Sequence, residues 1–197
     1  MMAMQIGFMK DKVKAAYRHR QFSNKLAEPE FAFIDQLEGP VAFWKNSLLL
    51  GNKRNYLKWE KNAKAVVIDL PDPNKKGQWS KKHADRLEKA LQTKLSCDSV
   101  AAKLVTAKQK AERNIYTLEV YEQVNNLVNF TMNALLSLKE YDLAQNKKEE
   151  MAAKAKIQKL SDEFKAVREE LESVYSKTRI LTKPADGIAL INKNHNR

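Results

Sequence analysis

The stretch from Asn146 to Thr178, NKKEEMAAKAKIQKLSDEFKAVREELESVYSKT, has the most regular spacing of apolar residues in the chain. Its apolar stripe consists of residues that follow one another at intervals of three or four: Ile157, Leu160, Phe164, Val167, Leu171 and Val174. Because an α-helix has about 3.6 residues per turn, this spacing places the whole stripe on one face. Charged residues occupy most positions between, so we expect an amphipathic helix that needs a partner.

The segment before this helix is its expected partner. Residues 116–141 carry a series of inward-facing candidates: Leu118, Tyr121, Val124, Leu127, Val128, Met132, Leu135 and Leu138. Residues 142–146 are enough to reverse the chain, which predicts a long antiparallel αα-hairpin. We expect Phe164, near the centre of the stripe, to be buried between the two helices, so that Phe164→Ala costs about 3–5 kcal/mol.

The composition favours the same fold class. The 197 residues include only five Gly and five Pro, which fits long helices with few tight turns. We therefore predict an all-α, multi-helix bundle with a long C-terminal αα-hairpin, in one structural domain. Its expected parts are a basic helical segment, a Pro-containing loop, a long-helix bundle with the hairpin, and an irregular tail: residues 1–70, 71–79, 80–184 and 185–197. Ile188, Leu190 and Ile191 of the tail are candidates to pack against the bundle.

The basic segment is predicted to hold helices over residues 3–22, 28–50 and 53–70. Gly39-Pro40 is expected to interrupt the second helix, because proline lacks the N–H that an interior helical position donates. The third helix ends in residues 65–68, of which Val66, Val67 and Ile68 are β-branched, and this end is either helical or extended.

The next segment begins with a loop, since Pro71 and Pro73 prevent a helix from continuing. Ser80 is expected to cap a helix over residues 81–93, with Ala84, Leu87 and Leu91 facing inward. Ser96 to Ser99 offers a second capping point, where the helix either bends or breaks before residues 100–113.

Charge is distributed unevenly along the chain. The net charge is +12, and residues 1–113 contain 23 basic and 12 acidic residues, against 13 and 12 in residues 114–197. Such asymmetry suggests an acidic partner such as nucleic acid, although solvated Lys-rich helix faces account for it as well. No Arg-rich run, zinc finger or aromatic RNA-binding signature accompanies the basic residues. We therefore predict only weak, sequence-blind binding to nucleic acid.

The sequence predicts no catalytic residue, cofactor site or metal site. His19, His83 and His195 lie singly in three segments, and Cys97 is the only cysteine. Adjacent carboxylates such as Glu149 and Glu150 point about 100° apart on a helix and do not converge on one atom. No apolar run approaches the length of a membrane span, so we expect a soluble chain, with export of a larger parent left open.

Three tryptophans are candidates for stacking on a ligand. Trp44 lies on an apolar helix line, which favours core packing. Trp59 sits among charged residues and is either a half-buried amphipathic ring or a ligand or partner contact. Trp79 follows the Pro-containing loop and either anchors that loop or contacts a ligand or partner.

Five runs carry a family resemblance: FWKNSLLLGNKRNYLKWE at 43–60, IDLPDP at 68–73, GQWS at 77–80, YTLEVYEQVN at 116–125 and KTRILTKP at 177–184. Together they resemble the helical region that follows the catalytic barrel in some bacterial family-20 glycoside hydrolases, the β-N-acetylhexosaminidases. The similarity covers residues 10–184, whereas the residues after Pro184 depart from the family pattern.

The resemblance implies a non-catalytic accessory module that packs on a catalytic domain, in cis or in trans. That family uses an Asp-Glu pair at the mouth of a (β/α)8 barrel, and its His-x-Gly-x-Asp-Glu signature has no counterpart here. No catalytic residue is therefore carried over, and the isolated chain is expected to lack hexosaminidase activity. Two alternatives stay open, a basic nucleic-acid-binding module and a helical scaffold or oligomerisation protein.

Overall fold

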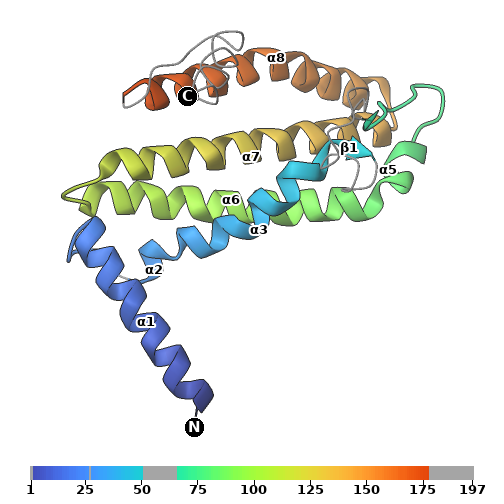
Figure 1. Ribbon diagram of the computed structural model, residues 1–197. Helices are drawn as coiled ribbons and strands as arrows, with labels where there is room; N and C mark the ends of the chain where they lie inside the picture. The colour runs from blue at the N-terminus through green and yellow to red at the C-terminus, as the bar shows by residue number, and fades with distance from the viewer. Residues whose placement is uncertain (1, 27, 51–65, 178–197) are drawn as a thin grey trace, which may run out of the picture.

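The computed structural model describes residues 2–26, 28–50 and 66–177 (Figure 1). The elements in chain order are α1 (Met2–Gln21), α2 (Glu28–Phe31), α3 (Phe33–Ser47), β1 (Leu49–Leu50), β2 (Val66–Val67), α5 (Gln78–Lys82), α6 (Ala84–Lys110), α7 (Ile115–Leu143) and α8 (Lys147–Ser176). The long helices α6, α7 and α8 lie side by side, with α7 in the middle. The prediction of an all-α multi-helix bundle with a C-terminal αα-hairpin is confirmed.

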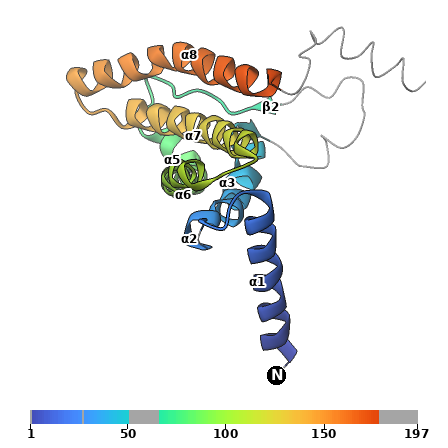
Figure 2. The ribbon, with the colours of Figure 1, turned by 90° about the vertical axis from the view of Figure 1, so that its left-hand side faces the viewer.

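The arrangement around α7 decides which surfaces are buried. The helix packs against α6 on one side and α8 on another, while α3 crosses both α6 and α7. α1 projects away from the bundle and meets it at the C-terminal end of α1 (Figures 1 and 2). There, the turn between α6 and α7 supplies donors to the last carbonyls of α1, because Asn114 Nδ2 lies 2.6 Å from Gln21 O and Glu112 N lies 3.1 Å from Phe22 O.

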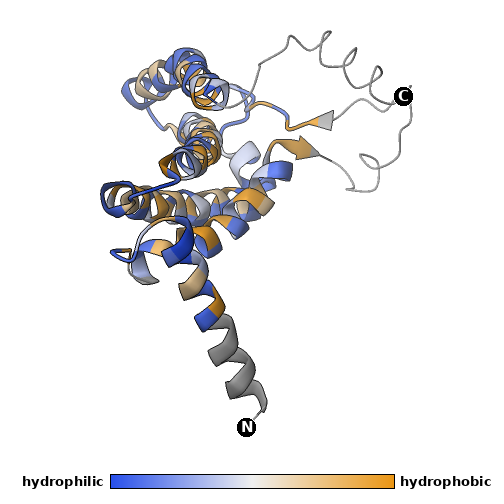
Figure 3. Ribbon diagram, turned by 60° about the vertical axis from the view of Figure 1, so that its left-hand side comes forward, coloured by the Kyte–Doolittle hydropathy of each residue, from blue (hydrophilic) through white to orange (hydrophobic). Residues whose placement is uncertain are grey.

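Two hydrophobic clusters form the core of the described residues. The first joins the end of α1 and α3 to α6 and α7 through Phe22, Leu26, Phe31, Phe33, Leu37, Val100, Leu104, Ala107 and Leu118. The second lies where α5 and α6 meet α7 and contains Ile68, Trp79, Leu87, Ala90, Met132 and Leu135. Figure 3 shows that the helices carry hydrophobic and hydrophilic residues together, as amphipathic helices do.

The expected break at Gly39-Pro40 is wrong, because α3 runs through both residues. A proline at position 40 leaves the carbonyl of Gln36 without its usual helical donor. The hydroxyl of Ser96, on α6, lies 3.4 Å from that carbonyl oxygen and donates to it. At the C-terminal end of α3, Arg86 donates to Ser47 O at 2.5 Å and to Leu49 O at 3.0 Å. α6 therefore supplies the hydrogen bonds that α3 cannot make itself.

The region around residues 77–99 differs from the prediction in three ways. α5 begins at Gln78 after Gly77, whose φ is 77°, so Ser80 is a residue within a helix and not an N-cap. α6 continues without a break through Ser96 to Ser99. Leu91 is 46% exposed instead of inward-facing, because α7 and α3 cover other sides of α6.

The β-branched residues at the end of the third predicted helix are extended. Val66 and Val67 pair antiparallel with Leu50 and Leu49, and Ile68 N donates to Leu48 O at 2.8 Å. The rest of that predicted helix, residues 53–65, lies outside the described residues, as do Trp59 and the tail at 185–197.

The hairpin turn follows the prediction closely. α7 extends to Leu143, so the connection is shorter than expected, and Asn146 caps α8. Asn146 Oδ1 accepts from Glu149 N at 3.0 Å, while the Glu149 carboxylate accepts from Gln145 N at 2.9 Å. This arrangement is a variant of the capping box, in which the Glu149 side chain reaches the amide of the residue before the N-cap, and it fixes where α8 starts.

The apolar stripe of α8 faces α7 but is only partly covered. Ala153 and Val174 are the buried residues of this helix, and Phe164 is 45% exposed. The Phe164 ring lies 5.4 Å from that of Phe130 on α7, measured between centroids. The expected burial of Phe164 is wrong because α7 covers only one side of α8.

Candidate functional site

Trp79 and Trp44 both contribute to the packing of the bundle. The Trp79 side chain is buried in the second cluster, and its Nε1 donates to Asp69 O at 2.7 Å. This contact anchors the loop at residues 71–77, and a ligand or partner contact for Trp79 stays a prediction. Trp44 packs against the same cluster and donates from Nε1 to Thr131 Oγ1 at 3.0 Å, as its core interpretation predicts.

Asp69, just before the loop at residues 71–77, contacts two basic side chains. Its carboxylate lies 2.8 Å from Lys82 Nζ and 2.9 Å from His83 Nε2. The hydrogen bond from Lys82, followed by that from His83, lowers the pKa of the Asp69 carboxyl to about 2. A charged Asp69 therefore holds the loop against the start of α6.

Asp142, which the sequence places in the hairpin turn, is a fully buried residue at the end of α7. Its backbone oxygen accepts from Gly77 N at 3.0 Å, and its carboxylate accepts from Ser80 N at 2.8 Å. Asp142 thereby satisfies donors at the start of α5, which has no side-chain cap of its own. Sequence analysis missed this role; a carboxylate in the last turn of a helix opposes the helix dipole, and that is the signal that could have pointed to it.

A second contact ties the same loop to the hairpin. Lys76 Nζ donates to Tyr141 O at 3.0 Å and lies 4.1 Å from the centre of the Tyr141 ring. The Glu150 carboxylate on α8 lies 2.6 Å from Lys154 Nζ and 3.8 Å from Lys76 Nζ. The loop, the end of α7 and the start of α8 are therefore joined, which gives this end of the bundle a fixed shape.

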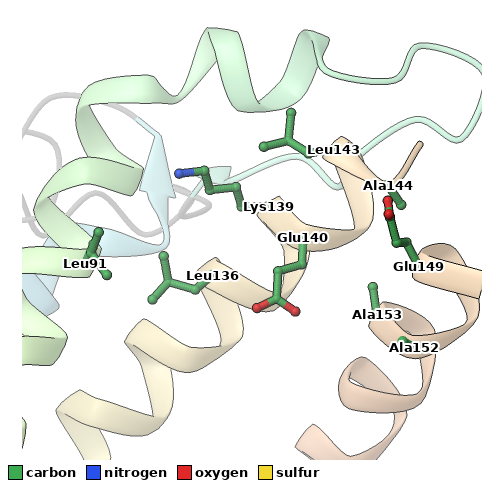
Figure 4. A pocket seen from close by; sticks show the side chains of 9 residues that line it. All are labelled: Leu91, Leu136, Lys139, Glu140, Leu143, Ala144, Glu149, Ala152 and Ala153. Atoms are coloured by element: carbon green, nitrogen blue, oxygen red, sulfur yellow. The ribbon is translucent and has the colours of Figure 1, made fainter. Parts of the chain in front are cut away.

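Beside this fixed end lies a hollow of about 530 Å³ that we call the hairpin groove (Figure 4). It is lined from three helices by Leu91, Leu136, Lys139, Glu140, Leu143, Ala144, Glu149, Ala152 and Ala153. Two of its carboxylates already have partners, since Glu140 pairs with Lys156 at 2.5 Å and Glu149 belongs to the capping box. The remaining lining is mainly aliphatic, which suits an apolar side chain better than a polar substrate.

Exposed aliphatic residues on α6 extend this apolar surface. Leu91, Leu95 and Val105 are 46%, 61% and 49% exposed, and their spacing keeps them within about 80° of one another around the helix. We call these three residues the α6 row. Sequence reasoning missed the row, although its signal was present: α6 has more apolar residues than one buried face can hold.

The described residues show no convergent metal-ligand set. Among them, no three or more His, Cys, Asp or Glu side chains are placed to hold a metal ion. Cys97 is buried, and loss of solvation raises the pKa of its thiol to about 11. No helix within the described ranges has the length and apolar character needed to cross a bilayer.

No protein-family model matches this chain, and it has no detectable similarity to a curated protein or to a solved structure. The resemblance to the helical region of family-20 glycoside hydrolases therefore stays a prediction from the sequence.

Proposed function

We propose that this chain is a non-catalytic helical module that packs against another protein, and that the partner is the catalytic domain of a glycan-degrading β-N-acetylhexosaminidase, in cis or in trans. The observation that supports a protein partner is the hairpin groove with the adjoining α6 row. The choice of partner rests on the sequence resemblance alone.

The apolar surface has the composition of a protein interface. Such interfaces have an apolar centre and a polar rim, and here Leu91 and Leu136 lie beside Lys139 and the Glu140–Lys156 ion pair. Full burial of one aliphatic side chain contributes about 1.5–3 kcal/mol, and association itself costs at least about 4 kcal/mol. Several such side chains are therefore needed to offset the cost of association, and the α6 row and the groove together supply them.

The ion pairs of the basic half weigh against the nucleic-acid alternative. Lys108 and Lys25 lie 2.6 Å and 2.7 Å from glutamate oxygens of Glu122 and Glu112, and Lys110 pairs with Glu30. A lysine that already has a carboxylate partner must lose it before it neutralises a phosphate. These three lysines are therefore not free to bind nucleic acid, although the pairs leave the net charge of the chain unchanged.

Calorimetric titration against the catalytic domain of a bacterial family-20 hexosaminidase, lacking its own helical C-terminal region, tests the proposal. We expect a Kd of about 1–100 µM, and we expect Leu95→Asp to weaken binding at least about tenfold. Leu95 is solvent-exposed, so this variant should fold normally. Met151→Asp is the matched control, because Met151 is 62% exposed on α8 and lies outside the hairpin groove and the α6 row.

Absence of binding at about 100 µM would contradict the proposed partner. Sedimentation velocity over a concentration series then tests the scaffold alternative. Self-association that Leu95→Asp abolishes would assign the same surface to a second copy of the chain instead.

A further inference from the structure

One charged side chain of the hairpin groove has no opposite charge beside it. Of the two carboxylates in the lining, Glu140 pairs with Lys156 and Glu149 accepts hydrogen bonds in the turn before α8. The Lys139 ammonium has no carboxylate at ion-pair distance within the described ranges of the chain. Figure 4 shows that the Lys139 side chain extends from α7 toward α6, whereas Glu140 extends in another direction.

Aliphatic side chains flank Lys139 in the groove. Leu91 of α6 and Leu136 of α7 line the groove with it, and Leu143 follows one turn further along α7. A charge beside apolar groups loses part of its hydration when a partner covers it, which costs free energy unless the partner supplies an opposite charge. A well-matched occupant of the groove therefore brings a carboxylate to Lys139 and apolar side chains to the leucines.

The shape of the surface favours a helix as the occupant. The α6 row from Leu91 to Val105 is about 21 Å long at about 1.5 Å per residue, which corresponds to about four helical turns. Across the groove, α8 presents the small side chains of Ala152 and Ala153, which let another helix approach closely. The lining comes from three helices and the hairpin turn, so it offers no strand edge for backbone pairing with an extended peptide.

We propose that the hairpin groove and the α6 row together bind an amphipathic helix of the partner protein, about 14 residues long, with a carboxylate at the end that meets Lys139. Its aliphatic side chains, at intervals of three and four residues, lie against Leu91, Leu95 and Leu136. This contact rests on the proposed function, because it takes the same surface as the protein interface. The helix and its carboxylate are the chemistry that the proposed function leaves open.

Charge substitutions at Lys139 test this contact in titrations against the hexosaminidase catalytic domain. Lys139→Glu should weaken binding at least about tenfold, whereas Lys139→Arg, which keeps the charge, should change it less than about threefold. Lys165→Glu is the matched control, because it makes the same charge change at an exposed position of α8 outside the groove lining. Unchanged binding by Lys139→Glu, with Leu95→Asp still weakening it, would overturn the carboxylate contact and leave the proposed function intact.

Synthetic helices test the surface independently of the catalytic domain. The probes are fluorescein-labelled, lactam-bridged peptides of about 14 residues, with leucines at helical spacing and one end residue that is Glu, Gln or Lys. Fluorescence anisotropy at low salt should show binding of the Glu peptide at least about tenfold tighter than that of the Lys peptide. The difference should shrink as salt screens the pair, and Lys139→Glu in the chain should reverse the order of the two peptides.

Each remaining outcome of the peptide series has a definite meaning. Equal affinity of the Glu and Lys peptides would overturn the carboxylate contact, and no binding of either at about 1 mM would overturn the helix as the occupant. Binding that Leu95→Asp leaves unchanged would place the peptide elsewhere on the bundle and overturn the proposal as well. Failure of the catalytic domain to bind, with the expected order of the peptides, would reject only the proposed partner.

Discussion

α6 and α8 both pack along α7, yet they are buried to very different degrees. α6 has seven buried residues, including Leu87, Val100 and Leu104, whereas α8 has only Ala153 and Val174. α3 covers a further side of α6, while α7 is the main partner of α8. The comparison teaches that the most regular apolar stripe in a sequence marks a helix with one partner. A helix with several partners carries apolar residues on several sides, which obscures its periodicity.

The largest expected effect is at the α6–α7 interface. Leu104 is fully buried in the first cluster, so Leu104→Ala should leave a cavity and lower the free energy of unfolding by about 2–5 kcal/mol. Urea unfolding followed by circular dichroism measures this loss. A loss below about 1 kcal/mol would mean that the α6–α7 interface is no more tightly packed than the α7–α8 interface.

Phe164→Ala should have a smaller effect. The ring is nearly half exposed and contacts Phe130 on one side, so we expect a loss of about 1–2 kcal/mol in place of the larger value that the sequence suggested. The same urea measurement applies. A loss as large as that of Leu104→Ala would mean that α8 is covered in solution by a surface beyond α7.

The long helices and the hairpin turn were predictable because each depends on contacts close in sequence. The spacing of residues 116–141 and the short turn that follows are local signals, and both agree with the structure. The continuity of α3 was not predictable, because Pro40 is tolerated through a hydroxyl sixty positions away, on Ser96. The same holds for the hairpin groove, which exists only where residues of α6, α7 and α8 meet.

Charge pairs at the loop should contribute less than either packed side chain. Because the pKa of Asp69 is about 2 when folded and 3.8 ordinarily, its stabilisation is present above about pH 4 and is lost as pH falls toward about 2. The Asp69 side chain is 45% exposed, so solvent screening limits the effect to under about 1 kcal/mol. The difference in unfolding free energy between the natural chain and Asp69→Asn should shrink over that range.

Gln158, exposed on α8, provides the control for this pH series, because its amide does not titrate. Gln158→Ala should show no comparable change in its difference from the natural chain between about pH 5 and pH 2, on the scale of about 0.5 kcal/mol expected for surface positions. A pH-independent difference for Asp69→Asn would mean that its contacts do not hold the loop in solution.

The smallest expected effect is nucleic-acid binding by the basic first half of the chain, in contrast to the second half, whose charges are nearly balanced. We expect weak, sequence-blind binding to DNA or RNA oligonucleotides that largely disappears near about 0.15 M salt, where the screening length is about 8 Å. Fluorescence anisotropy over a salt series measures it. Submicromolar affinity at that salt concentration would contradict this prediction and favour the nucleic-acid alternative.

The projection of α1 has a consequence for how the backbone amides exchange with solvent. Its C-terminal end is fixed by Asn114 and Glu112 and by the buried Phe22, but its N-terminal turns extend away from the bundle. A short helical stretch that extends beyond the body of a bundle is only marginally stable in water, so these amides should exchange by local opening. Amides in the middle of α6 and α7 should exchange only on global unfolding. One chain should thus show two exchange regimes, with the boundary inside α1.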